Sequence, residues 1–585
     1  MNQKTPAQPS RRQMIIRSGL GLGSLAAMAI PQAVEAAAKP AKSTRWDHEA
    51  DVVCVGSGAA AGTAAVTAAG AGASVIVVEK MPMAGGTTGK SGGVAWIPNH
   101  PFLKEHGLKD ERADCLRYMA RYGYANQYDP NSPTLGLTPT AYRQLEAFYD
   151  NGSAMLANMD KLGVVRFQQF TMWHVNKLAP DYADHLPENK TPRGRAIEPA
   201  VGAGGASGGG SLAGQFEKWL SERRVPILLE HRVTRLVKDG DRVIGVEAEH
   251  EGKPVRIKAK KAVIFGTGGY AHNTELIRKH QPAIYGSCAR PGSTGDFIAI
   301  AQTAGAGMGA LHTAWRTQVV VEEALENRAL GLAAFVLPGD SMILVNKHGR
   351  RIVNEKINYN DRTESHFVFD ALEKEYPNFI QFMIFDERTL DAFAGAYPLP
   401  ADRRSAPHLI SGATLAELAQ NIAARLQKIQ ARIGAYTLAP EFANNLAETV
   451  SRFNGYARNG IDPEFKRGLH AYDADWQAVF SPWRKETTQT PNTLPNITMY
   501  PLADNGPYHA IILGPGALDT CGGPQINEHA QVLDPAGKPI PGLYGAGNCI
   551  ASPTSRAYCG AGGTIGPAMT FGYIAARHAL GVGKS

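Results

Sequence analysis

Two glycines and a glutamate stand at the spacing of a dinucleotide-binding turn. Gly56 and Gly58 follow an apolar run at 52–55, and Glu79 ends the next apolar run at 75–78. Such a turn brings backbone N–H groups to a pyrophosphate at a helix start, and the acid can accept from a ribose hydroxyl. Further candidates in the turn are Ser57, Ala59 and Ala60. The segment predicts a dinucleotide site, with a small-residue helix packed on a sheet as the alternative.

A second group of glycines and hydroxyls follows directly after this acid. Such a loop can place amides and hydroxyls on phosphates, although a flexible loop would have the same composition. Its candidate binding residues are Lys80, Gly86, Thr87, Thr88, Ser91, Gly92 and Gly93. Other cofactor-binding candidates lie in short strands, strand-ending turns or helix openings further along: Val233, Gly268, Gly269, Asp296, Gly547, Asn548, Gly563, Thr564 and Ile565.

The composition is that of a globular protein with no nucleic-acid partner. The chain has 585 residues, which predicts more than one domain. Of the net charge of +7, residues 1–38 carry +3 through four basic residues and one acidic residue. The rest is too weakly and too diffusely basic for a nucleic-acid surface. The six cysteines form no CxxC pair, so no metal site is predicted.

The N-terminus has the pattern of an export signal. Arg11 and Arg12 precede an apolar stretch at 19–33, and alanines at 36–38 form a plausible cleavage region. This predicts that residues 1–38 are a twin-arginine signal and that the chain is exported to the periplasm. An ordinary basic N-terminus on a cytoplasmic protein is the alternative. The apolar stretch is too short for a good membrane span, and no other segment approaches one.

The order of the apolar runs predicts an α/β fold. Strand-and-helix patterns with glycine turns occupy 46–314 and return at 505–585, whereas 315–504 is richer in charge and in amphipathic helices. We therefore predict a Rossmann-like nucleotide-binding domain in two parts, 46–314 and 505–585, with an α+β domain inserted at 315–504.

Several of these motifs together resemble a known family. They are Gly-Gly-Thr-Thr-Gly-Lys-Ser-Gly-Gly at 85–93, Gly-Arg-Arg-Ile-Val-Asn-Glu at 349–355, Gly-Leu-Tyr-Gly-Ala-Gly-Asn at 542–548 and Gly-Ala-Gly-Gly-Thr-Ile-Gly-Pro-Ala at 560–568. They resemble the FAD-dependent oxidoreductase 2 (fumarate reductase/succinate dehydrogenase flavoprotein) family over nearly everything after residue 46. Trp-Ile-Pro-Asn at 96–99, the stretch 557–562 and Thr-Val-Ser-Arg-Phe-Asn at 449–454 look most like its 3-ketosteroid Δ1-dehydrogenase and cyclic ketone dehydrogenase branch.

The resemblance implies non-covalent FAD, a catalytic domain inserted in the FAD domain, and α,β-desaturation of a cyclic ketone. Carried over by motif, Tyr359 takes the proton α to the carbonyl, and Tyr558 with the N–H of Gly562 binds the ketone oxygen. An ordinary core tyrosine is the alternative for Tyr359. The expected pocket residues are Trp173, Phe335 and Tyr182.

Two departures bear on the substrate. Cys559 stands where the family commonly has proline, and Phe170-Thr-Met-Trp falls where the branch places aromatic pocket residues, including a tyrosine that supports the base. The substrate is therefore left open between a 3-ketosteroid and a smaller ring such as cyclohexanone. The sequence does not distinguish a quinone from a soluble carrier as the electron acceptor.

Two rival functions stay open at this point. One is a periplasmic reductase of a conjugated acid such as fumarate or urocanate, which needs arginines on a carboxylate. Arg556 is the one arginine of the C-terminal flavin segment before Arg577. The other rival is a flavin protein of electron transfer or assembly with no substrate of its own.

Overall fold

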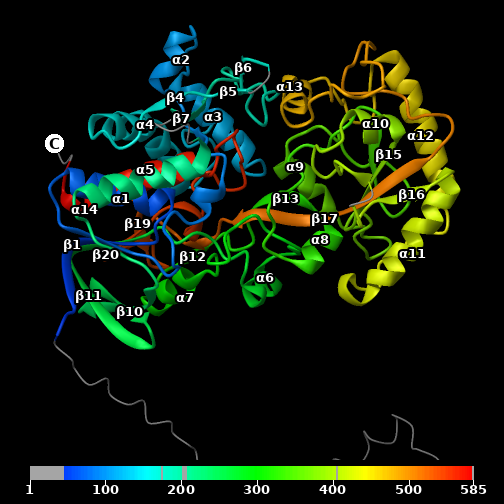
Figure 1. Cartoon of the computed structure of the whole chain (residues 1–585). Helices are drawn as coiled ribbons and strands as arrows, with labels where there is room; N and C mark the ends of the chain where they lie inside the picture. Colours follow the sequence, from blue (N-terminus) through cyan, green and yellow to red (C-terminus); the bar gives the residue numbers. More distant parts are fainter. Residues whose placement is uncertain (1–44, 173–174, 201–206, 404–405, 583–585) are drawn as a thin grey trace, which may run out of the picture. The chain divides into compact units, whose positions relative to one another are not determined.

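The computed structural model describes residues 45–172, 175–200, 207–403 and 406–582. Residues 46–585 form one compact unit (Figure 1). The predicted signal at 1–38 and the predicted pocket residue Trp173 lie outside the described residues.

The first sheet has eight strands, and its central strand carries the glycine turn. β1 (His48–Val55) lies between β11 (Lys253–Phe265) and β2 (Val75–Val78), and all three run parallel. Parallel strands covered on both faces are apolar throughout, which is why 52–55 and 75–78 read as unbroken apolar runs. The other strands of this sheet are β8 (Ile227–Leu228), β9 (Arg232–Asp239), β10 (Arg242–His250), β19 (Gln531–Leu533) and β20 (Pro539–Gly545).

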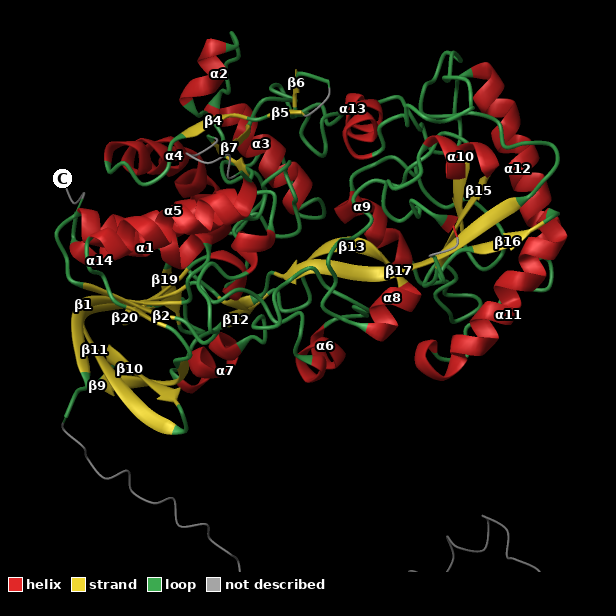
Figure 2. Cartoon of the chain, in the orientation of Figure 1, coloured by secondary structure: helices red, strands yellow, loops and turns green. Residues whose placement is uncertain are grey.

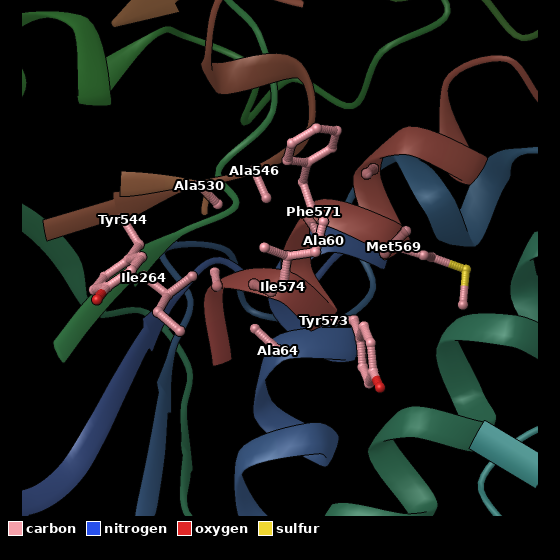
Figure 3. Packing of buried hydrophobic residues seen from close by; sticks show 14 of the residues in the cluster. Ala60, Ala64, Ile264, Ala530, Tyr544, Ala546, Met569, Phe571, Tyr573 and Ile574 are labelled. Carbon is pink, nitrogen blue, oxygen red and sulfur yellow. The ribbon is translucent and has the colours of Figure 1, made fainter. Parts of the chain in front are cut away.

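The last helix returns the chain to its first glycine turn. α14 (Ile565–Leu580) packs against α1 (Ala59–Gly70), and an added Cβ at Gly572 would lie 2.3 Å from the carbonyl oxygen of Ala60. Figure 3 shows Ala60 of α1 beside Ile574 of α14 in this core. The contact places the residues at 558–568 next to the N-terminal turn.

The second sheet has five strands and is antiparallel. Its order is β13 (Ala314–Val320), β17 (Tyr508–Thr520), β15 (Gln381–Asp386) and β14 (Met342–Val345), with β16 (Ile410–Gly412) also paired to β17. Helices α11 (Leu415–Ile433) and α12 (Phe442–Asn459) lie along it and bury their apolar faces in its core (Figure 2). β17 is a long strand of the second sheet, and its C-terminal end points toward the first sheet (Figure 1).

The remaining elements are short apart from three helices near the first sheet. These three are α3 (Arg112–Gly123), α4 (Pro139–Lys161) and α5 (Gly208–Glu222). The others are α2 (Pro101–Glu105), α6 (Thr274–His280), α7 (Asp296–Thr303), α8 (Val321–Glu326), α9 (Tyr359–Glu364), α10 (Glu387–Ala392), α13 (Ala471–Phe480), β3 (Ala95–Trp96), β4 (Phe167–Gln169), β5 (Thr171–Met172), β6 (Lys177–Leu178), β7 (Ala196–Pro199), β12 (Met308–Gly309) and β18 (Gly523–Pro524).

The structure confirms the α/β fold class. The first sheet contains the parallel strands of a nucleotide-binding fold, and the separate antiparallel sheet is built largely from the chain region between the two parts of the first sheet. The boundaries at 315 and 504 stay predictions, since the strands β13 and β17 that border this region pair with each other. Among the described residues, no helix is both long enough and apolar enough to cross a membrane.

Candidate active site

A cleft that is partly open to solvent lies where the strands β1, β2, β11 and β20 end. Gly56 turns the chain there at φ +98°, and an added Cβ would lie 2.5 Å from the carbonyl oxygen of Gly266. Only glycine fits this approach. Gly58 precedes the first turn of α1, whose leading N–H groups have no partner within the helix. The N–H of Ala59 donates to the Thr88 hydroxyl at 2.9 Å, and the cleft faces the positive end of the helix dipole.

The acid of the motif is held in place by the same turn. The hydroxyl of Ser57 donates to Glu79 Oε2 at 2.6 Å, and the N–H of Met81 donates to Oε1 at 2.9 Å. Each oxygen keeps a further lone pair. Because the carboxylate is buried but lines the cleft, it is oriented to accept from a ribose hydroxyl.

Most of the cofactor residues predicted from the sequence line this one cleft. They are Gly56, Ser57, Gly58, Ala59, Ala60, Glu79, Lys80, Gly86, Thr87, Thr88, Ser91, Val233, Gly268, Asp296, Gly547, Asn548, Thr564 and Ile565. Four predicted residues are absent from the lining: Gly92, Gly93, Gly269 and Gly563. Gly93 instead lies against the backbone of Gly208, and Gly563 against the ring of Tyr558.

An ion pair closes one side of the cleft. Lys80 Nζ lies 3.0 Å from Asp296 Oδ2 and 2.6 Å from the hydroxyl of Thr294, and Arg232 lies 3.0 Å from Asp296 Oδ1. Burial acts to raise the pKa of Asp296, but hydrogen bonding and charge from Arg232 and Lys80 outweigh it, so the pKa lies below its usual value. Asp296 is therefore a structural anion here.

Sequence reasoning missed Asp519, at the end of β17. Its carboxylate is buried and accepts from the hydroxyl of Ser293 at 2.7 Å and from the N–H of Gly269 at 2.9 Å. Burial raises its pKa, against the lowering effect of these hydrogen bonds. Nothing around 519 in the sequence marks a ligand site, because only the pairing of β17 carries this residue to the cleft. Other lining residues that were missed include Met81, His231, Thr267, Arg290 and Ser293.

Three buried tyrosines from distant parts of the chain meet beside this cleft. Tyr359 begins α9, and its ring centroid lies 5.4 Å from those of Tyr182 and Tyr558. The rings of Tyr182 and Tyr558 stack at 5.1 Å. The structure therefore brings Tyr359, the predicted base, together with Tyr558, the predicted ketone donor. Tyr182, a predicted pocket residue, lies against both rings.

The hydroxyl groups of this cluster form a short chain. The Tyr182 hydroxyl donates to Tyr359 Oη at 3.0 Å. Burial raises the pKa of Tyr359 well above its ordinary value, and the neighbouring tyrosines add to this shift. Burial also raises the pKa of Tyr558, although the hydroxyls of Tyr359 and Thr564 act against that rise.

Gly562 supplies a backbone donor four residues after Tyr558. It sits at φ +87°, and an added Cβ would lie 2.4 Å from the carbonyl oxygen of Val94. Its carbonyl accepts from the N–H groups of Trp96 and Gly566, whereas its own N–H has no protein acceptor within the described ranges. An unpaired, rigidly held N–H is suited to binding an oxygen that gains charge.

Other aromatic rings surround the tyrosines. Phe335, a predicted pocket residue, lies 5.2 Å from Tyr359. Three rings that were not predicted as pocket residues contact Tyr558 or Tyr182; they belong to Trp315, Tyr472 and Trp476. The Trp315 ring N–H also donates to Asn548 Oδ1 at 2.9 Å. Since Asn548 lines the cleft, the tyrosine cluster adjoins the cofactor site directly.

Comparison with known proteins agrees with this geometry. The model of the FAD binding domain family matches residues 51–565. A 4-oxocyclohexanecarboxylate 2-dehydrogenase of Sinomonas cyclohexanicum is 32% identical over 91% of this chain and 93% of its own length. A 3-oxosteroid 1-dehydrogenase of Mycolicibacterium smegmatis is 30% identical over 90% of this chain and 97% of its own.

A solved structure has a similar fold. The 3-ketosteroid Δ1-dehydrogenase of Sterolibacterium denitrificans, in complex with 1,4-androstadiene-3,17-dione, superposes with a TM-score of 0.75 at 25% identity. The match covers 91% of this chain and all of that one. The chain belongs to the FAD binding domain family of oxidoreductases, and FAD is its cofactor. The nucleotide half of FAD fits the glycine turn, the start of α1 and Glu79.

Proposed function

We propose that this protein is an FAD-dependent dehydrogenase that introduces an α,β double bond into a cyclic ketone. The observation that carries the proposal is the meeting of Tyr359, Tyr182 and Tyr558 next to the cofactor cleft. The N–H of Gly562, four residues after Tyr558, has no acceptor among the described residues. A base and two donors for one oxygen are what α-proton removal from a ketone requires. The names of the relatives, dehydrogenases of ring ketones, support the same reaction.

Each residue has a distinct part in this reaction. The Tyr558 hydroxyl and the Gly562 N–H hold the ketone oxygen and stabilise the negative charge that develops there. Tyr359 Oη takes the α proton in its deprotonated form. Burial and the neighbouring tyrosines disfavour that form by raising the pKa of Tyr359, and the hydrogen bond that the Tyr182 hydroxyl donates acts in the opposite direction once the phenolate has formed. Bound oxidised FAD supplies the acceptor for the hydride that leaves the β carbon. The ring therefore loses one proton and one hydride, and a C=C bond forms.

The packing around the tyrosines favours a monocyclic ketone over a steroid. Tyr182 is in ring contact with Tyr472 at 5.2 Å and with Trp476 at 6.2 Å. This layer of rings lies against Tyr359, and Phe335 contacts the same ring at 5.2 Å, so large side chains surround the base. A relative named for a cyclohexane ring is consistent with a small substrate.

A reductase of a conjugated acid is the rival reaction. It requires an arginine that holds the substrate carboxylate. Arg362 lies near Tyr359 but is buried and donates to the carbonyl of Ile357 at 2.9 Å and to the side chain of Gln318 at 2.7 Å. Arg556 is exposed. The geometry gives this rival no matching support.

The decisive experiment is anaerobic mixing of the FAD-loaded protein with cyclohexanone and, separately, with a 3-ketosteroid. We expect either ketone to bleach the flavin absorption, faster with cyclohexanone, and Tyr359→Phe to abolish bleaching while FAD stays bound. If neither ketone bleaches the flavin, but dye-reduced protein is reoxidised by fumarate or urocanate, the reductase replaces the proposal. No response to any of these compounds would favour an electron-transfer role.

We also propose that the protein works in the periplasm and passes its electrons to a quinone or a soluble carrier. Arg11 and Arg12 with the apolar stretch after them support export, although this segment lies outside the described residues. Cell fractionation of the native chain and of Arg11→Lys/Arg12→Lys tests it: a wild-type protein that stays in the cytoplasm would contradict export.

A further inference from the structure

Three potential metal ligands meet at a seam beside the tyrosine cluster. Asp184 and His185 follow Tyr182 in the chain, and His470 is the residue before α13. One ligand atom from each of the three lies within 4.8 Å of the others. The two imidazole rings stack with centroids 4.3 Å apart and an interplanar angle of 28°. The chain separation of nearly 300 residues hides this set from sequence reasoning.

The three side chains have spare bonding capacity. The Asp184 side chain is only 8% exposed, and its Oδ1 is buried without a hydrogen-bond partner. Its Oδ2 accepts from the N–H of Tyr472 at 3.2 Å, which orients the carboxylate. Among the described residues, neither imidazole ring forms a hydrogen bond to another protein group. His185 Nδ1 lies 3.7 Å from Asp184 Oδ1, which is too long for a hydrogen bond. A buried unpaired carboxylate oxygen is rare and calls for an explanation.

We propose that Asp184, His185 and His470 bind a divalent cation of the zinc class. Two imidazoles and one carboxylate are a ligand set that Zn²⁺ accepts, and water completes a tetrahedron when three protein ligands are present. The ion would satisfy the bare Asp184 oxygen and would place the two stacked imidazoles as neutral ligands around one centre. Packing of the two histidines, with a protonated His185 in an ion pair 3.7 Å from Asp184 Oδ1, is the competing explanation, but it leaves that buried oxygen without a hydrogen bond.

The position of this site gives the ion a structural task. Lys177 Nζ lies 2.9 Å from Asp475 Oδ1 and Arg193 lies 3.5 Å from Asp475 Oδ2, so two ion pairs already join the region of β6 to α13. Figure 1 shows α13 beside β5 and β6. An ion at the same seam would fasten the segment that carries Tyr182 to the helix that carries Tyr472. It would thereby hold Tyr182 against Tyr359, a positioning role that rests on the proposed function.

Metal binding is measured without any ketone. The FAD-loaded protein is treated with a chelator, dialysed and titrated with ZnCl₂ by calorimetry, and bound zinc is counted by elemental analysis. We expect one tightly bound ion per chain in the wild type. Because loss of even an outer partner weakens metal sites by about 10- to 100-fold, Asp184→Asn and His470→Gln are expected to weaken binding by at least about 100-fold.

His250→Gln is the matched control. The ring of His250 also stacks on a histidine, His231, at 4.0 Å, but it is not part of a three-ligand group. Zinc affinity equal to that of the wild type is expected for this variant. If the wild type binds zinc no more tightly than His470→Gln, or if His250→Gln loses as much affinity, the site is overturned.

Hydrogen exchange tests the positioning role. Zinc is expected to slow amide exchange at 181–186 and 470–480 in the wild type and to leave it unchanged in His470→Gln. Zinc removal is expected to slow ketone-driven flavin bleaching in the wild type alone. Tight binding without slower exchange would overturn the positioning role. Failure of the proposed dehydrogenation would appear differently, as intact zinc binding and exchange protection with no bleaching by any ketone.

Discussion

The Tyr182→Phe variant tests the hydrogen bond that supports the proposed base. The Tyr182 hydroxyl donates to Tyr359 Oη at 3.0 Å, and both side chains are buried. A hydrogen bond to a charged group contributes about 1.5–3 kcal/mol. If Tyr359 acts as a phenolate, loss of this donor raises the barrier by that amount, which corresponds to a rate about 10- to 150-fold lower. Phenylalanine keeps the ring contacts, so only the donor is removed.

The assay is anaerobic stopped-flow reduction of the bound flavin by cyclohexanone at a series of ketone concentrations. The limiting rate constant is expected to fall in Tyr182→Phe, while the ketone concentration at half-maximal rate changes little. Tyr508→Phe is the matched control, because this buried tyrosine of β17 donates to the carbonyl of Ala503 at 2.8 Å, away from the tyrosine cluster. Its rate constant is expected to equal that of the wild type.

Two results would refute the reasoning. A Tyr182→Phe rate within two-fold of the wild type would mean that the hydroxyl does not stabilise the base. A loss of the same size in Tyr508→Phe would mean that the assay reports general damage to the fold. A fall in apparent ketone affinity alone would place Tyr182 in substrate binding and not in support of Tyr359.

Three further outcomes are expected. Because the pKa of Tyr359 is raised and its deprotonated form is the active one, the rate constant of flavin reduction should increase from about pH 7 to about pH 10; a plateau near neutral pH would contradict this. Glu79→Gln should weaken FAD binding by about 10- to 150-fold, through loss of a charged acceptor worth about 1.5–3 kcal/mol, whereas exposed Glu49→Gln should bind FAD normally in the same fluorescence titration. Gly56→Ala should abolish FAD binding, since its Cβ would lie 2.5 Å from the Gly266 oxygen; a yellow Gly56→Ala protein would show that the turn tolerates the clash.

The cofactor site was predictable from short segments because its chemistry is local. Gly56, Gly58 and Glu79 are separated by one strand, one turn and one helix, and these elements follow from apolar runs and glycine positions. The amphipathic helices predicted within 315–504 are confirmed by α11 and α12. Local hydrophobic period and turn residues determine such elements.

The tyrosine cluster was only partly predictable. The roles of Tyr359, Tyr558 and Gly562 came from resemblance and stay predictions, and the structure brings the rings of Tyr359 and Tyr558 together. The resemblance implies a tyrosine that supports the base near 170–173, where this chain has Phe-Thr-Met-Trp instead, and in the structure Tyr182 donates to Tyr359. Neighbouring positions on an irregular segment cannot be ranked without knowing which of them faces inward.

By itself, the sequence determined the α/β class, the position of the first glycine turn and the identity of the acid beside it, because these depend on residues close together in the chain. Only the tertiary structure decided that Asp519 at the end of β17 reaches the cleft and that the Tyr182 hydroxyl forms a hydrogen bond to Tyr359. It also decided that ligand atoms of Asp184, His185 and His470 lie within 4.8 Å of one another. The physical reason is that strand pairing and helix packing, which act between segments hundreds of residues apart, bring these side chains together, and no local pattern records such contacts.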